Sequence, residues 1–125
     1  MKHLLLLCTL LISFNSFADE LSDAEDAYRN GDYTTAITSF KKLAGQGDAN
    51  AQYNLGWMYN NGEGTPQDYK AAIEWYTKSA EQGDAVSQVN LGWMYRQGEG
   101  TPQDYKLSSG IPKQQSKVLQ MRRTI

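Results

Sequence analysis

The sequence predicts an all-α protein, an α/α solenoid of antiparallel helix pairs preceded by a signal peptide. Two observations predict the solenoid: a nearly identical internal repeat of 36 residues, and apolar side chains spaced four residues apart within it. The chain has 125 residues, a net charge of −2 and 40% hydrophobic residues. This length and composition suit one small domain or a short repeat array rather than two independent cores.

The first 18 residues have the pattern of a signal peptide. Lys2 gives a positive start, Leu4–Phe14 is an apolar stretch, and Ser16-Phe17-Ala18 is a small-x-small cleavage site before Asp19. We therefore expect residues 1–18 to be removed and the mature protein to be periplasmic or secreted, with no membrane association after cleavage. An uncleaved anchor or a buried helix is the alternative interpretation of this segment.

Removal of this segment would leave a chain without cysteine or histidine, because Cys8 and His3 are the only ones in the sequence. The mature protein would then have no disulfide, no thiol nucleophile, no imidazole base and no Cys/His zinc site. The sequence therefore predicts a protein that is not an enzyme, with no catalytic residues, no metal and no cofactor.

Residues 19–47 form the first predicted helix pair. Its first helix holds Ala24, Ala27 and Tyr28, and residues 32–47 repeat residues 68–83 at eight positions. The connection between its two helices is five residues shorter than in the unit that follows. This unit is therefore a weaker copy of the repeat.

Residues 48–83 form one full repeat, whose first helix is predicted from Ala49 to Asn60. Asp48 is a good N-cap for this helix, and Ala51, Leu55 and Tyr59 recur at four-residue steps on one face. Gly56 lies inside the helix, where glycine costs about 1 kcal/mol relative to alanine. Because it recurs as Gly92, we interpret it as permitting a close contact between helices.

The second helix of this repeat is predicted to begin near Thr65-Pro66, since proline suits the first helical turn. It ends at Gly83, which has the character of a C-terminal cap. Its apolar residues are Ala72, Trp75, Tyr76 and Ala80. We expect Trp75 to pack in the core.

Residues 84–106 form an incomplete repeat, identical to 48–70 except at five positions. The five pairs are Asn50/Val86, Ala51/Ser87, Tyr53/Val89, Asn60/Arg96 and Asn61/Gln97. Its helix, Ala85–Gln97, has no second helix to pair with, so we expect marginal stability and weak self-association through Leu91 and Tyr95.

Residues 107–125 depart from the repeat and form a predicted irregular basic tail. They read LSSGIPKQQSKVLQMRRTI, with four basic and no acidic residues, where the repeat predicts AAIEWYTKSAEQG. Codons for residues 109–125 can be chosen so that another frame reads WYTKAAEQGFANAQNN. We hypothesise a frameshifted continuation of a longer array, with disorder after Lys106. The alternative is a tail that binds an acidic surface or nucleic acid, and the lack of interleaved aromatic residues argues against nucleic acid.

The spacing of glycine, alanine and aromatic residues resembles a known repeat family. The pattern runs Ala51-x-x-x-Leu55-Gly56-x-x-Tyr59-x-x-Gly62-x-Gly64, then Asp68-x-x-x-Ala72-x-x-Trp75-Tyr76-x-Lys78-x-Ala80-x-x-Gly83. It resembles the Sel-one-like repeat (SLR), a relative of the tetratricopeptide repeat, and residues 27–37 are closer to an ordinary tetratricopeptide repeat. The resemblance covers residues 21–106 and implies an α/α solenoid that contacts protein partners.

By analogy with tetratricopeptide arrays, a binding groove is expected along the first helices of the units. The candidate partner-binding residues are Asn50, Tyr53, Trp57, Asn60, Val89, Trp93 and Arg96, with Val86 beside them. Tryptophan is common at the energetic centre of binding surfaces, so Trp57 and Trp93 are the expected anchors. The alternative is that both pack between helices.

Three functions are compatible with the sequence. The first is an exported, non-enzymatic adaptor that holds a protein or peptide in a helical groove. The second is a truncated, frameshifted remnant of a longer SLR protein with little independent function. The third, an exported enzyme acting on cell-wall glycans, is disfavoured because Glu63, Glu99, Asp68 and Asp104 recur with the repeat as loop and capping residues.

Overall fold

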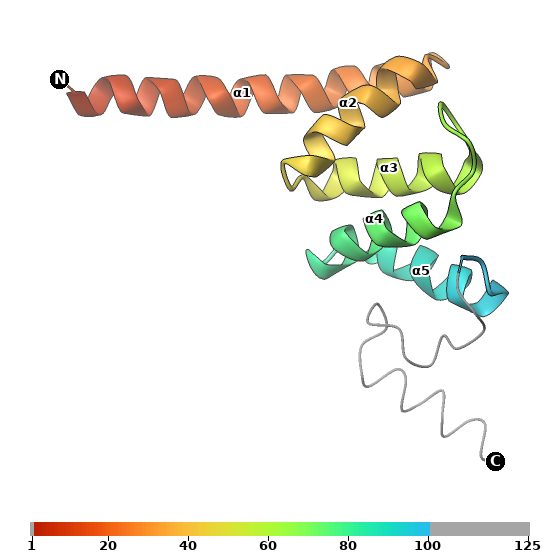
Figure 1. Ribbon diagram of the computed structural model, residues 1–125. Helices are drawn as coiled ribbons and strands as arrows, with labels where there is room; N and C mark the ends of the chain where they lie inside the picture. Colours follow the sequence, from red (N-terminus) through yellow and green to blue (C-terminus); the bar gives the residue numbers. More distant parts are fainter. Residues whose placement is uncertain (1, 101–125) are drawn as a thin grey trace.

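The computed structural model describes the chain from residue 2 to residue 100, and its side chains from residue 16 onward. The described part holds five helices and no strand: α1 (Lys2–Arg29), α2 (Tyr33–Gly45), α3 (Ala49–Asn61), α4 (Tyr69–Glu81) and α5 (Ala85–Gln97). Figure 1 shows them stacked one after another, with α1 extending past the others. The predicted all-α solenoid is confirmed. Residues 101–125, including the predicted tail, lie outside the described residues.

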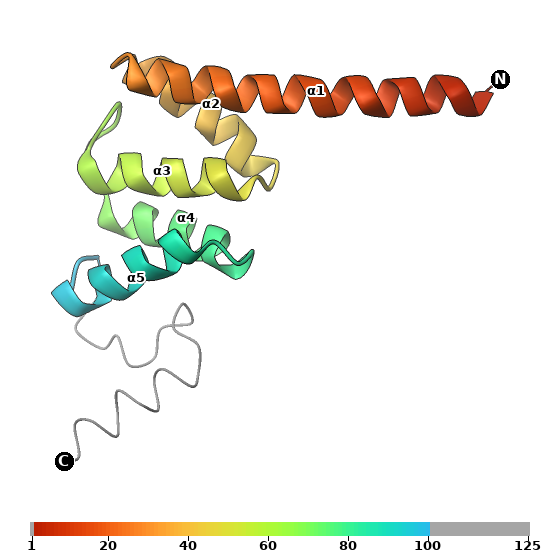
Figure 2. The same cartoon turned by 180° about the vertical axis from the view of Figure 1, so that it is seen from behind.

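Each helix packs mainly on the helices next to it in the chain. Contacts join α1 to α2, α2 to α3, α3 to α4 and α4 to α5, and the view from behind shows the same order (Figure 2). Neighbour-only packing is the defining property of a solenoid. Such a stack places the first helices of successive units in equivalent positions.

Two apolar clusters form the core. The first lies among α1, α2 and α3 and includes Phe40, Leu43 and Leu55, all at most 1% exposed. The second lies mainly between α4 and α5 and includes Tyr76 and Leu91. Tyr59, at the end of α3, packs against both clusters and so joins them.

Four helices begin with an aspartate that caps the first turn. In each case a side-chain oxygen accepts a hydrogen bond from the backbone N–H three residues on, which satisfies an amide that the helix leaves unpaired. The pairs are Asp32 with Thr35 (3.2 Å), Asp48 with Ala51 (2.7 Å), Asp68 with Ala71 (3.1 Å) and Asp84 with Ser87 (2.8 Å).

The predicted start of the second repeat helix is wrong by one turn. α4 begins at Tyr69, with Asp68 as its N-cap, and Pro66 precedes the helix. The connecting loop is instead held against the end of α3, because Asp68 N donates to Tyr59 O at 2.9 Å and Gln67 Nε2 donates to Asn60 O at 2.8 Å. Capping by Asp68 therefore outweighs the preference of proline for a first turn.

The predicted self-association surface on the last helix is also wrong. Leu91 and Tyr95 are 0% and 5% exposed and belong to the α4–α5 core cluster. The apolar face of α5 already packs on α4, the helix before it, so these two residues are not available to a second copy. The exposed apolar residues of α5 are Val86, Val89 and Trp93.

α1 is a continuous helix across the predicted cleavage site after Ala18. Phe17, just before that site, packs against the first core cluster together with Leu21. The N-terminal half of α1 extends away from the other helices (Figure 1). Between residues 2 and 100, no helix has both the length and the apolar character needed to cross a membrane.

Candidate protein-binding surface

Trp57 and Trp93 occupy equivalent positions on α3 and α5, and both reach solvent. Trp57 is 38% exposed and Trp93 is 58% exposed, which is unusual for so large a side chain. Val86 lies seven residues before Trp93, on the same face of α5, and is 52% exposed. Its counterpart on α3, Asn50, is also exposed. We call Asn50, Trp57, Val86 and Trp93 the tryptophan surface.

Trp57 is oriented by a hydrogen-bonded chain that joins three parts of the fold. Its Nε1 donates to the hydroxyl of Tyr28 on α1 at 2.9 Å. That hydroxyl in turn donates to Glu63 Oε2, in the loop after α3, at 2.8 Å. Burial, with the hydrogen bond to Glu63, raises the pKa of Tyr28 to about 12. The indole is therefore tied at its N–H edge while its ring remains partly in water.

Sequence reasoning did not single out Tyr28 and Glu63 as neighbours of Trp57. The sequence places Tyr28 on the first predicted helix and Glu63 among the loop and capping residues, with no link between them. The two residues are 35 positions apart and belong to different units. Glu63 lies in the loop that is five residues longer than its counterpart in the first unit, which is the one sequence signal that singles out this segment.

Two of the predicted partner residues, Tyr53 and Asn60, are partly covered by the structure. The ring of Tyr53 lies 5.9 Å from that of Tyr76 on α4, and Asn60 lies beneath the loop through its bond to Gln67. Their counterparts on α5, Val89 and Arg96, are exposed. The predicted residues therefore form two groups. Asn50 and Trp57 on α3 and Trp93 on α5 are exposed, whereas the positions of Tyr53 and Asn60 are partly covered on α3 and exposed on α5.

Trp75 differs from the other two tryptophans. It lies on α4, is partly buried and packs against the first core cluster. The ammonium of Lys78 lies 4.4 Å from its ring centroid, a cation–π contact. This placement agrees with the expectation that Trp75 serves packing.

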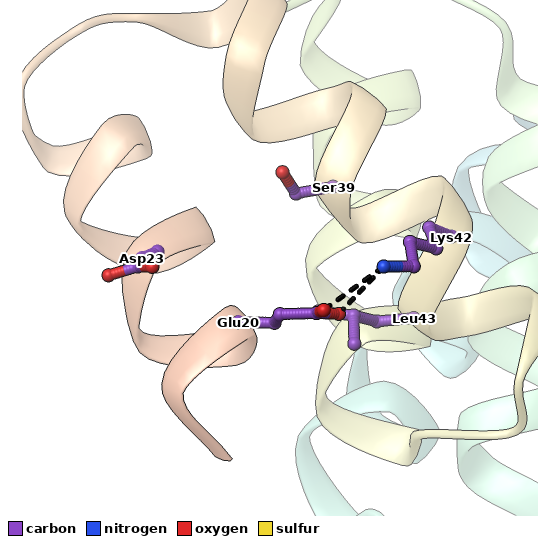
Figure 3. A pocket seen from close by; sticks show the side chains of 5 residues that line it. All are labelled: Glu20, Asp23, Ser39, Lys42 and Leu43. Atoms are coloured by element: carbon purple, nitrogen blue, oxygen red, sulfur yellow. Dashed lines mark hydrogen bonds and ion pairs between the residues drawn. The ribbon is translucent and has the colours of Figure 1, made fainter. Parts of the chain in front are cut away.

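A shallow hollow of about 250 Å³ lies between α1 and α2, away from the tryptophan surface. It is lined by Glu20, Asp23, Ser39, Lys42 and Leu43. Figure 3 shows the Lys42 ammonium directed at the Glu20 carboxylate, with Nζ–O distances of 3.0 and 3.1 Å. The charges of Lys42 and Glu20 neutralise each other, and Asp23 is the other charged residue of the lining. Among the residues with described side chains, no group of three His, Cys, Asp or Glu could hold a metal ion.

Comparison with known proteins identifies the repeat. The Sel1 repeat family, the Sel-one-like repeat that the sequence resembles, matches residues 49–84 and 85–108. Residues 49–108 of the chain are Sel1 repeats. The two matches coincide with the nearly identical units that carry Trp57 and Trp93. Proteins built from Sel1 repeats generally mediate protein interactions.

Curated relatives share a short stretch of this Sel1 repeat protein. DAP3-binding cell death enhancer 1 from Rattus norvegicus and from Mus musculus are each 48% identical to it over 40 residues. This stretch is 32% of the chain but only 8% of either relative. The likeness therefore concerns the repeat, not the whole of those proteins.

Two solved structures share the fold over a larger part of the chain. A Sel1 repeat protein from Oxalobacter formigenes is 38% identical, with a TM-score of 0.56 over 58% of this chain and 30% of its own. The protein c5321, a protective antigen of uropathogenic Escherichia coli strains with an SLR fold, is 32% identical, with a TM-score of 0.67 over 72% of this chain and 20% of its own. The chain thus spans less than a third of either structure.

Proposed function

We propose that this Sel1 repeat protein is an exported adaptor that binds a protein or peptide through the tryptophan surface, without catalysing a reaction. The observation that carries the proposal is the recurrence of an exposed tryptophan at the same register of α3 and α5. Large apolar side chains exposed together on a surface often mark interaction sites. Large, amphipathic side chains of this kind are enriched at the centres of protein interfaces.

The surroundings of the tryptophans support recognition of a peptide-like partner. Val86 adds apolar area beside Trp93, while the amide of Asn50 offers both a donor and an acceptor for a backbone. Trp57 is held in place by Tyr28, so part of its side-chain entropy is already lost before a partner binds. The name of the curated relatives, DAP3-binding cell death enhancer 1, also describes binding to a protein.

Cross-linking with variants of the full chain tests the tryptophan surface. A partner captured by the wild-type protein from its native compartment is expected to be lost with Trp93→Ala, and retained with Glu74→Ala, which changes an exposed residue of α4. Trp93 is 58% exposed, so we expect the variant to fold, and a thermal melt verifies this. Equal capture by Trp93→Ala and wild type would refute the surface.

Export rests on the signal-like pattern of residues 1–18. The extension of the N-terminal half of α1 beyond the stack is compatible with removal of that segment (Figure 1). We expect the mature protein to be periplasmic or secreted and to begin at Asp19. Mass spectrometry of the protein from fractionated cells is the test, and an intact N-terminus in a cytoplasmic fraction would refute export.

A remnant of a longer array is the second candidate. It is favoured by the loss of the repeat pattern after Lys106. The genomic DNA decides it. Codons that cannot be translated into repeat residues in a second frame would remove the frameshift hypothesis.

A further inference from the structure

Gly56 and Gly92 stand at the same register of α3 and α5 but have different surroundings. A Cβ added at Gly56 would lie 2.8 Å from Cδ1 of the Tyr76 ring on α4, so the glycine is what allows that ring to seat on α3. A Cβ added at Gly92 would meet nothing within 4 Å among the described residues. α5 therefore has a glycine at the position that contacts the Tyr76 ring on α3, but no ring among the described residues lies against it.

The polar groups that fix α4 on α3 recur around Gly92. Ser79 Oγ donates to Ala49 O at 2.8 Å, and Gln82 Nε2 donates to Gly47 O at 2.9 Å and to Gln52 Oε1 at 2.7 Å. The corresponding acceptors one repeat later are those of Ala85, Gly83 and Gln88, which are the same residue types.

Gln88 is also held in the same way as Gln52. Gln52 Nε2 donates to Ala44 O and Gln88 Nε2 donates to Ala80 O, both at 3.2 Å. In both residues the amide nitrogen is bonded to the preceding unit, and in Gln52 the amide oxygen accepts from Gln82 at the end of α4. Gln88 has the same side chain held by the same bond.

One face of α5 is exposed where the same face of α3 is covered. Gln52 is 4% exposed and Gly56 is buried, whereas Gln88 is exposed and Gly92 only half-buried. Val89, 70% exposed, completes this face with Arg96. We call Gln88, Val89, Gly92 and Arg96 the α5 seat. It lies beside the tryptophan surface and shares no residue with it.

The chain's own continuation does not supply the matching ring. Residues 101–106 repeat 65–70, but Pro112 stands 36 positions after Tyr76, and Ser108 and Ser116 replace Ala72 and Ala80. The residues that directly follow Lys106 therefore do not repeat the sequence pattern of α4. All the second-type helices among the described residues are already packed in their own units.

We propose that the α5 seat binds an amphipathic helix from another polypeptide that has the chemistry of α4. Such a helix carries an aromatic residue with alanine four positions before and after it, and a serine and a glutamine that follow on the same side, as Ala72, Tyr76, Ala80, Ser79 and Gln82 do. The seat continues the α3–α4 interface by one repeat. The inference does not depend on the tryptophan surface and stands if that surface binds nothing.

A synthetic peptide of residues 67–83, labelled for fluorescence anisotropy, tests the seat on the full chain. We expect saturable binding to the wild-type protein, and binding at least about tenfold weaker for a peptide carrying Tyr76→Ala, because the ring fills the seat. Gly92→Ala in the protein should weaken binding by a similar factor, since its Cβ would lie under 3 Å from the ring. Gly45→Ala, an open helical glycine on α2, is the matched control and should bind as wild type.

The Gly92→Ala variant also separates the seat from other sites. The added Cβ meets no atom within 4 Å among residues 2–100, so we expect the variant to fold as wild type, which a thermal melt verifies. A peptide that displaced α4 from α3 would bind Gly92→Ala and wild type equally, and that result overturns the proposal. Absence of peptide binding overturns it as well, as does a wild-type dimer that Gly92→Ala converts to monomer, because the occupant would then be a second copy.

Discussion

A glycine inside a helix destabilises it, and Gly56 and Gly92 show two different outcomes of that cost. Replacing Gly92 with alanine should raise the free energy of unfolding by up to about 1 kcal/mol, because helix propensity improves and the new methyl group meets none of the described residues. Gly56→Ala has the same propensity gain but forces its Cβ against the buried Tyr76 ring, and overpacking costs about 1–3 kcal/mol. In urea denaturation, Gly92→Ala should therefore be more stable than the wild type, and Gly56→Ala should be less stable.

Equal effects of the two substitutions would contradict this prediction. If Gly56→Ala and Gly92→Ala change the unfolding free energy equally, then α4 is not seated on Gly56 as the structure has it. The double variant should show the sum of the two single changes, since the sites do not share a contact in the described residues.

Tyr28 links the stability of the first unit to alkaline pH. Its pKa is about 12 in the fold against an ordinary value of 10.0, so the folded state keeps a proton that the unfolded state loses in this interval. Its stabilising contribution is complete below pH 10 and is lost as the pH rises toward 12. Tyr76, whose pKa is also raised by burial, adds to the same loss.

Tyr28→Phe should reduce this alkaline loss of stability and leave the part due to Tyr76. Below pH 10 the variant should be less stable than wild type, because Trp57 Nε1 and Glu63 lose their partner. Urea midpoints measured from below pH 10 to about pH 12 provide the test. An unchanged pH profile in Tyr28→Phe would show that the Tyr28 proton is not coupled to folding.

At the scale of single elements, the beginning of α4 depends on Asp68 and not on Pro66. Asp68→Ala should lower the free energy of unfolding by about 1 kcal/mol, because the N–H of Ala71 loses its acceptor. Pro66→Ala should change stability by much less, since Pro66 precedes the helix and makes no capping bond. Thermal or urea unfolding of the two variants shows which residue determines where α4 begins. A larger effect from Pro66→Ala would favour a start near Thr65-Pro66 over the start at Tyr69.

Most helix boundaries could be predicted from sequence because local signals agree there. The limits of α3 and α5 follow from an aspartate cap, apolar residues at helical spacing and a glycine after the last turn, Gly62 or Gly98, each with a positive φ near 70°. The start of α4 could not be predicted from sequence, because Pro66 and Asp68 favour different first turns. Contacts of the loop with the end of α3 decide between them.

The candidate surface was only partly predictable, for a related reason. A repeat of identical residues fixes which positions are equivalent but not what covers each of them. Tyr53 and Val89 hold the same register, yet one packs against Tyr76 and the other is open. The bond between Trp57 and Tyr28 likewise joins two units of different sequence, which no local pattern shows.

At the scale of the whole molecule, α3 and α5 differ in the number of helices packed on them among the described residues. In a solenoid each unit is stabilised by its own helices and by the interface with its neighbours. α3 lies between α2 and α4, whereas α5 packs on α4 and, among the described residues, carries nothing on the face formed by Gln88, Val89 and Gly92. Two helices of nearly the same sequence are therefore predicted to have different local stability.

Hydrogen exchange of the native protein measures this difference directly. Amides of α5 should exchange faster than the equivalent amides of α3, because opening α5 breaks one interface while opening α3 breaks two and exposes residues of both core clusters. Comparing register-matched pairs such as Leu55 with Leu91 removes most of the effect of sequence on intrinsic exchange. Equal protection in the two helices would mean that the array unfolds only as one unit.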